Sequence, residues 1–149
     1  IERELVPFAQ TYGTALIPWS PLAGGFLTGK YKRGEQPPQD TRHGARQNER
    51  TRLLFSEPSF AVLDVVQAIA QEKGCTPSQV ALAWVAGQPA ITSPIIGPRT
   101  MEQLEDNLGA TAVVMTDEDR ARLDEVSPPG RAIVPYYQAD WGPHRYARF

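Results

Sequence analysis

The chain has 149 residues, of which 41% are hydrophobic, and it carries a formal net charge of −2. This composition suits a globular core and argues against nucleic acid as a partner. Because no apolar run approaches the ~18 residues of a membrane span, we expect a cytoplasmic protein without a membrane partner. A single cysteine and two histidines exclude an internal disulfide and argue against a structural zinc site.

The first predicted elements are a helix and a strand. Residues 1–12 place apolar side chains on one stripe of a helix, which Gly13 ends. A short apolar strand over residues 14–19 leads into a glycine-rich segment that closes on Lys30. Glycines let backbone N–H groups approach a phosphate, and a lysine supplies a point charge. The segment therefore predicts a loop folded over an anion, and the alternative is an ordinary turn.

Residues 32–57 are the least regular part of the sequence. They combine glycines and prolines with arginines at positions 33, 42, 46, 50 and 52. A loop this long within a compact domain is typical of a lid or a binding loop. The alternative is a polar loop with at most one ligand contact.

Two helices are predicted next. Pro58 opens the first, in which apolar residues recur at helical spacing until Gly74. The second begins with a capping box from Thr76 to Gln79 and is apolar almost throughout. We expect it to be deeply packed with Trp84 in the core. Cys75, which lies between the helices, is expected to be a small packing residue.

A second strand over residues 91–96 also runs into a helix. Thr100 and Gln103 have the spacing of a capping box, so this helix is predicted to begin at Met101. The N–H groups and dipole at a helix start attract anions, and Arg99 stands directly before this one. The segment predicts an anion site, and the alternative is a capped surface helix with a solvated arginine.

The rest of the chain carries fewer signals. Gln103 and Asn107 are four residues apart on one helix face, where both are placed to hydrogen-bond a heterocycle. A last, charged helix begins at Thr116 and is expected to lie at the surface with solvated charges. The tail is rich in aromatic residues, which we expect to pack against the outside of the fold rather than to line a pocket: Tyr136, Tyr137, Trp141, Tyr146 and Phe149.

The two strand-to-loop segments together resemble the C-terminal part of the aldo-keto reductase family. One branch of it includes bacterial and plant oxidoreductases and the β subunits of potassium channels. That branch carries aromatic-Ser-Pro-Leu-x-x-Gly-x-Leu-x-Gly-Lys-Tyr, matched by residues 19–31, and Gly-x-Arg/Ser-x-x-x-Gln-x-x-x-Asn, matched by residues 97–107. Residues 74–84 resemble the helix that links the two. The resemblance covers residues 1–126 as one barrel segment and leaves 127–149 as a tail.

The resemblance implies NADPH as the cofactor. Trp19 matches the aromatic residue on which the nicotinamide stacks, and Arg42 resembles the arginine that closes a loop over the pyrophosphate. An arginine at position 99 argues for NADP over NAD, because its planar fork can hold the 2′-phosphate by two hydrogen bonds. The cofactor-binding residues implied are Trp19, Ser20, Pro21, Leu22, Ala23, Gly25, Lys30, Arg42, Gly97, Arg99, Gln103, Asp106 and Asn107.

The family fold is of the α/β class, an eight-stranded (β/α)8 TIM barrel that normally needs ~250 residues. With 149 residues and two predicted parallel strands, the chain is expected to be the C-terminal portion of such a barrel, incomplete by itself. The implied activity is NADPH-dependent reduction of aldehydes and ketones, with a small-molecule carbonyl as substrate. The family's catalytic Asp, Tyr, Lys and His come from the first half of the barrel, so we assign no catalytic residue and no metal ligand here.

Two other interpretations stay open. The chain could be a non-catalytic NADP(H)-binding module, such as a redox-sensing subunit. It could also be a degenerate product that neither folds alone nor binds. NADPH binding without turnover is the outcome expected of the module, and an absence of cooperative melting is the outcome expected of the degenerate product.

Overall fold

A computed structural model describes residues 1–45 and 48–134, and the elements below are those of this part of the chain. Arg46 and the aromatic residues of the tail lie outside the described residues. The helices and short 3₁₀ turns are, in order, α1 (Leu5–Tyr12), η1 (Ala23–Thr28), α2 (Glu49–Leu54), α3 (Glu57–Lys73), α4 (Pro77–Ala86), α5 (Met101–Leu108), η2 (Gly109–Ala112) and α6 (Asp117–Val126).

Local capping signals explain where these helices begin and end. Gly13 and Gly74 adopt left-handed conformations (φ 65° and 64°) at the ends of α1 and α3, as predicted. Thr76 and Thr116 each form a complete capping box with the residue three positions on. The capping box expected at Thr100 is only half formed.

The two predicted strands meet, but not as regular strands. Within the described residues they form two isolated parallel bridges, Leu16 with Ile91 and Trp19 with Ile95. The Leu16 N–H donates to Ala90 O (3.1 Å), the Thr92 N–H to Leu16 O (2.9 Å) and the Ile95 N–H to Pro18 O (2.8 Å). The ladder stays short because Pro18 and Pro94 have no N–H to donate.

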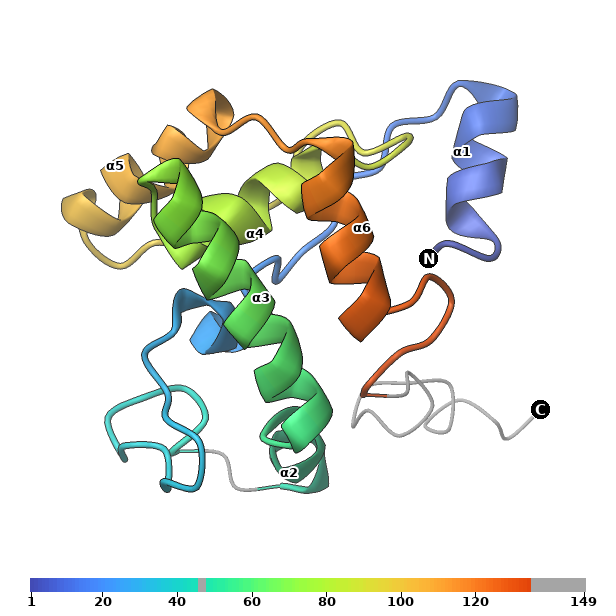
Figure 1. Ribbon diagram of the computed structural model, residues 1–149. Helices are drawn as coiled ribbons and strands as arrows, with labels where there is room; N and C mark the ends of the chain where they lie inside the picture. The colour runs from blue at the N-terminus through green and yellow to red at the C-terminus, as the bar shows by residue number, and fades with distance from the viewer. Residues whose placement is uncertain (46–47, 135–149) are drawn as a thin grey trace.

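The core is built around α3, the long central helix in Figure 1. One buried cluster joins α3 to α4 and α6 through Val66, Ile69, Ala70, Val80 and Leu123. Cys75 packs against it as predicted, whereas Trp84, expected in the core, packs against it but is only partly buried. A second cluster joins η1 to the start of α3 through Phe26, Tyr31, Phe60 and Leu63. Ala23 and Leu27 of the glycine-rich turn pack against this second cluster, which therefore stabilises the turn.

Three expectations need correction. The apolar stripe of α1 is only partly covered, since Ala9 is 2% exposed but Leu5 is 50% exposed and Tyr12 71%, and Figure 1 shows α1 at the edge of the molecule. The segment 32–57 is not wholly irregular, because Asn48 caps α2 within it. In α6 one charge is buried rather than solvated, because Asp119 is only 5% exposed.

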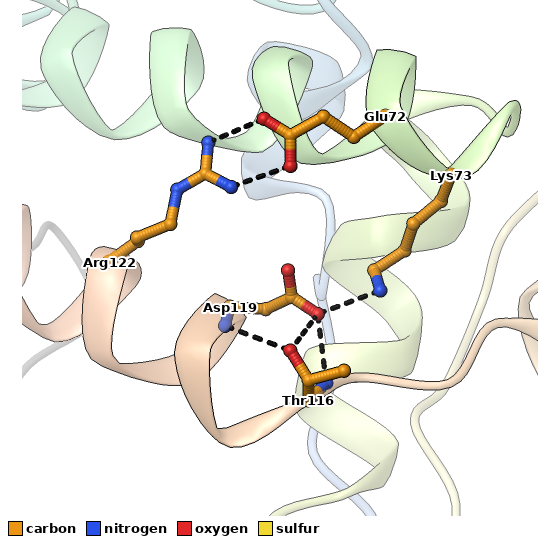
Figure 2. Close-up of polar contacts among 5 residues, drawn as sticks. All are labelled: Glu72, Lys73, Thr116, Asp119 and Arg122. Atoms are coloured by element: carbon orange, nitrogen blue, oxygen red, sulfur yellow. Dashed lines mark hydrogen bonds and ion pairs between the residues drawn. The ribbon is translucent and has the colours of Figure 1, made fainter.

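Two ion pairs fasten α6 to the end of α3 (Figure 2). Asp119 Oδ2 lies 2.8 Å from Lys73 Nζ and also accepts hydrogen bonds from the Thr116 N–H and hydroxyl. The Arg122 guanidinium donates to both carboxylate oxygens of Glu72, at 2.7 and 3.0 Å. The charged groups of Asp119 and Arg122 are therefore positioned by contacts with α3 and not by solvation alone. In the described part of the chain no helix combines the length and apolarity needed to cross a bilayer.

Candidate functional site

The two segments singled out in the sequence end side by side. The Trp19–Ile95 bridge is parallel, so both segments run in the same direction and give way to their loops at the same edge. Ser20 opens one loop and Gly97, two residues beyond Ile95, opens the other. Parallel pairing therefore brings together the two loops to which the sequence assigned anion binding.

The turn after Trp19 has an unusual backbone. Ser20 (φ 61°) and Ala23 (φ 49°) are left-handed although neither is glycine, and Gly24 (φ 67°) and Gly25 (φ 93°) follow. Left-handed backbone at a non-glycine residue costs about 1 kcal/mol or more, and such strain is concentrated at functional sites. Trp19 itself is 58% exposed.

The N–H groups of this turn are partly used within it. The Ala23 N–H donates to Ser20 O (3.0 Å) and the Gly25 N–H to Leu22 O (2.9 Å). These two groups are therefore not available to a phosphate in this conformation. Any anion held here depends chiefly on neighbouring cationic side chains.

Lys30 and Arg42 supply that charge. A Cβ atom built on Gly25 would lie 2.9 Å from Lys30 Nζ, so the glycine lets the ammonium group lie against the turn. A Cβ atom on Gly24 would lie 3.3 Å from Arg42 Cδ, which places the arginine stem over the same turn. Neither cation forms an ion pair within the described residues, whereas Arg33, Lys73 and Arg122 each do.

A hollow of about 260 Å³ opens beside Lys30. Its walls come from the start of the 32–57 segment, including the Pro37–Pro38 pair that precedes Arg42. Lys32 and Glu35 contribute one charge of each sign to the lining. The arrangement is that of an arginine-bearing segment folded back toward the glycine-rich turn.

His43 also lies on this turn, although no role is predicted for it from the sequence. Its Nε2 is 3.0 Å from Ala23 O, and its ring packs edge-on against Tyr31 and Phe55. Burial lowers the pKa of His43 below its ordinary value; the hydrogen bond to Ala23 raises this pKa, and the charges of Arg42, Lys30 and Arg50 lower it further. The only sequence signal that could have indicated the position of His43 at the turn is that it directly follows the matched arginine, Arg42.

The second loop presents Arg99 at the start of α5. Thr100 Oγ1 accepts the Gln103 N–H, while Gln103 Oε1 accepts the Arg99 N–H at 2.8 Å. This second bond replaces the missing half of the capping box. The Gln103 amide is thereby held beside Arg99, and both side chains stay exposed with no ion pair to Arg99 in the described part of the chain.

Asp106 points elsewhere. Its Oδ2 accepts from Thr76 Oγ1 and its Oδ1 from Gln79 Nε2, both at 3.2 Å, and Gln79 Nε2 also donates to its backbone carbonyl at 2.8 Å. The carboxylate therefore ties α5 to the start of α4. Of the predicted adenine-side residues, Gln103 is exposed and Asn107 is half-buried, whereas Asp106 has a structural role in this conformation.

A larger hollow of about 390 Å³ lies near Cys75, between the end of α3 and η2. Burial raises the pKa of the Cys75 thiol, with smaller and opposing contributions from Lys73 and Asp106. A thiol of this kind is a poor nucleophile. Among the described residues, no group of three His, Cys, Asp or Glu side chains is arranged to hold a metal ion.

Comparison with known proteins identifies the family. Residues 1–128 match the model of the aldo/keto reductase family. The chain is 37% identical over 130 residues to the uncharacterized oxidoreductase YrpG of Bacillus subtilis. It is 35% identical over 130 residues to a putative voltage-gated potassium channel subunit beta of Schizosaccharomyces pombe, and 34% identical over 134 residues to the versiconal hemiacetal acetate reductase of Aspergillus parasiticus.

These alignments cover 87%, 84% and 90% of this chain but only 37%, 37% and 38% of the relatives. The chain thus spans little more than a third of the length of the proteins it matches. The match nevertheless includes both loops that meet beside Trp19 and Ile95. On this evidence the chain belongs to the aldo/keto reductase family.

Proposed function

We propose that this chain supplies the NADP(H)-binding part of a reductase that converts aldehydes and ketones to alcohols. In this proposal it is the C-terminal portion of a (β/α)8 barrel, and the catalytic Asp, Tyr, Lys and His lie outside it. The observation that carries the proposal is the parallel pairing of the Trp19 and Ile95 segments. It brings the exposed indole of Trp19 and the start of the loop that presents Arg99 to the same edge, where ligands bind in barrels of this class.

Each part of the site has a distinct task in binding. The Trp19 ring offers a face for the nicotinamide, while Lys30 and Arg42 neutralise the pyrophosphate. Arg99 holds the 2′-phosphate and Gln103 lies beside it, toward the adenine. The cofactor, when bound, supplies the hydride that reduces the carbonyl carbon.

Arg99→Ala tests this assignment in the full encoded protein. Losing the arginine should weaken NADPH by on the order of 2 kcal/mol, about thirtyfold, because only NADPH has the 2′-phosphate. NADH should be affected far less. Titration calorimetry would measure the dissociation constants of both cofactors.

Two control variants test whether the loss of NADPH affinity is specific to Arg99. Arg131→Ala removes an exposed arginine of the turn after α6 and should change neither constant. Trp19→Ala should weaken NADPH and NADH to a similar extent. Equal losses of NADPH and NADH on Arg99→Ala would contradict the assignment.

A second function is favoured by one comparison. The relative from Schizosaccharomyces pombe is named as a potassium channel β subunit, which suits a redox-sensing subunit that binds NADP(H). NADPH binding without turnover of any carbonyl substrate, in the full encoded protein, would support this second function over the first. The cytoplasmic location, the absence of a nucleic-acid partner and the division at residue 126 stay predictions from the sequence.

A further inference from the structure

We propose that His43 is a positioning residue that fixes Arg42 over the Ala23–Gly25 turn and makes cofactor binding depend on protonation of its imidazole. This inference rests on the proposed function, because it assumes that the turn receives the pyrophosphate. It adds a residue for which neither the sequence nor the comparisons give a role.

Two contacts of His43 Nε2 place the imidazole on the glycine-rich turn. A carbonyl oxygen only accepts, so the 3.0 Å contact with Ala23 O requires hydrogen on His43 Nε2. The same nitrogen lies 2.5 Å from the position that a Cβ atom on Gly24 would take. The imidazole therefore lies directly on the left-handed turn, in space that exists only because residue 24 is glycine.

Aromatic packing keeps the imidazole in place. Its centroid lies 5.7 Å from that of Tyr31 and 5.6 Å from that of Phe55, both with near-perpendicular rings. Tyr31 is only 4% exposed and belongs to the core cluster below the turn. His43 thus connects the segment that carries Arg42 to the core, and Arg42, the preceding residue, is held over Gly24.

The charges around His43 influence whether its imidazole is protonated. Among the described residues, the charged groups that act on it are Arg42 of its own segment, Lys30 beyond η1 and Arg50 of α2, all cationic. They disfavour the imidazolium, as burial also does, so His43 is mainly neutral near pH 7 in the free protein. A bound pyrophosphate would offset these charges and raise the pKa of His43.

The direction of the pH effect follows. Because the pKa of His43 is higher in the complex than in the free protein, binding takes up a proton. Affinity should therefore increase as the pH falls through the pKa of the complex. Protonation adds hydrogen at Nδ1, so the Nε2 donor to Ala23 O is kept in both states.

The test uses two variants of the full encoded protein. His43→Ala removes the donor and the ring, whereas His43→Gln keeps an amide N–H donor the same number of bonds from Cα but cannot be protonated. Binding of NADP⁺ would be measured by titration calorimetry at about pH 7.5 and about pH 5.5, on either side of an ordinary histidine pKa. Ionisation of the 2′-phosphate changes the affinity for NADP⁺ with pH by the same factor in the wild type and in both variants. A difference in pH dependence between the proteins therefore comes from His43.

The expected results are specific. His43→Ala should weaken NADP⁺ roughly five- to tenfold at pH 7.5, the loss expected when one hydrogen bond no longer positions a charged group. His43→Gln should retain most of the affinity at that pH. Between the two pH values the wild type should gain about threefold or more over His43→Gln. Adenosine 2′-phosphate, which has no pyrophosphate, should bind all three proteins equally.

Other outcomes separate the two proposals. If the wild type binds NADP⁺ at neither pH, the proposed function fails and this inference fails with it. If the wild type binds and His43→Ala binds as tightly, the inference alone is overturned. The pH dependence is overturned if wild type and His43→Gln change in parallel, and a purely structural role is indicated if His43→Ala also weakens adenosine 2′-phosphate.

Discussion

The hydroxyl of Tyr31 is buried and has no hydrogen-bond partner within the described residues. Its ring stacks with Phe26 and contacts Phe55. Lys30 Nζ lies over the Tyr31 ring, 5.1 Å from its centroid. An orphaned buried hydroxyl costs about 1–3 kcal/mol of desolvation. Tyr31 is therefore retained at this position at some cost to stability.

Tyr31→Phe should raise the free energy of unfolding by about 1 kcal/mol, because it removes the orphaned group and keeps the ring contacts. Urea denaturation of the full encoded protein would measure the change. Ser59→Ala is a matched companion, since the Ser59 hydroxyl is also buried without a partner in the described part of the chain. Destabilisation by Tyr31→Phe alone would instead mean that a ligand or another segment accepts the Tyr31 hydrogen bond.

Single residues also show the limit of sequence reasoning about the site. The sequence predicted Trp19, Lys30 and Arg99 as cofactor-binding residues from motifs that are continuous along the chain, and this assignment stays a prediction. It could not show that Asp106 turns toward Thr76 and Gln79, since that contact spans about thirty residues. His43 was missed for the same reason, because its partner Ala23 lies twenty residues earlier.

At the scale of elements, the attachment of α6 to α3 depends on one buried charge. Burial alone would raise the pKa of Asp119, but hydrogen bonds from Lys73 and Thr116 outweigh it and hold this pKa below the ordinary value. The second pair, between Glu72 and Arg122, is more exposed. Exposed pairs contribute little because water and salt screen them.

Asp119→Asn should reduce the free energy of unfolding by about 2 kcal/mol near neutral pH, because it leaves Lys73 without its partner in a partly buried place. Glu72→Gln is the control and should cost much less. Thermal or urea unfolding of both variants would measure the difference. Equal losses would show that Asp119 has no special role in holding α6.

The pH dependence gives an independent check on the same contact. Since the pKa of Asp119 is lower in the folded state, its contribution is present above the unfolded pKa of about 3.9 and is lost as the pH falls through the folded value. The parent protein should therefore lose more stability than Asp119→Asn between about pH 5 and about pH 2. Parallel acid unfolding curves would contradict this.

At the scale of the molecule, large apolar surfaces lie uncovered. The α1 face exposes Leu5, Phe8 (52%) and Tyr12, and the paired segments expose Ile17 (61%) and Ile95 (51%). Within residues 1–45 and 48–134, the two parallel segments pair only with each other, and unpaired backbone edges favour association. These are the surfaces that further strands and helices of a barrel would cover under the proposed function.

Produced alone, the 149-residue chain should self-associate, with sedimentation coefficients that rise with concentration. Phe8→Glu should reduce this association because it places a charge on the apolar face of α1. Gln10→Glu adds the same charge on the opposite side of α1 and should have little effect. A soluble monomer with cooperative melting would contradict the expectation, and the absence of any cooperative melting in all three would favour the degenerate product.

The sequence by itself determined most of the helices and the family. Capping boxes, C-terminal glycines and helical spacing act over a few residues, so they predicted where α3, α4, α5 and α6 begin and where α3 ends. The two loop motifs are also local, and they were sufficient to indicate an aldo/keto reductase. Local signals of this kind do not depend on which segments later become neighbours.

Tertiary structure decided the rest. Only pairing across some seventy residues brings Trp19 beside Ile95. Only packing buries Asp119 against Lys73 and leaves Leu5, Phe8 and Tyr12 of α1 exposed. Contacts of this range depend on the relative placement of whole helices, which no short pattern encodes. The place of His43 on the Ala23 turn is of this kind, because it exists only once the 32–57 segment has folded back over the core.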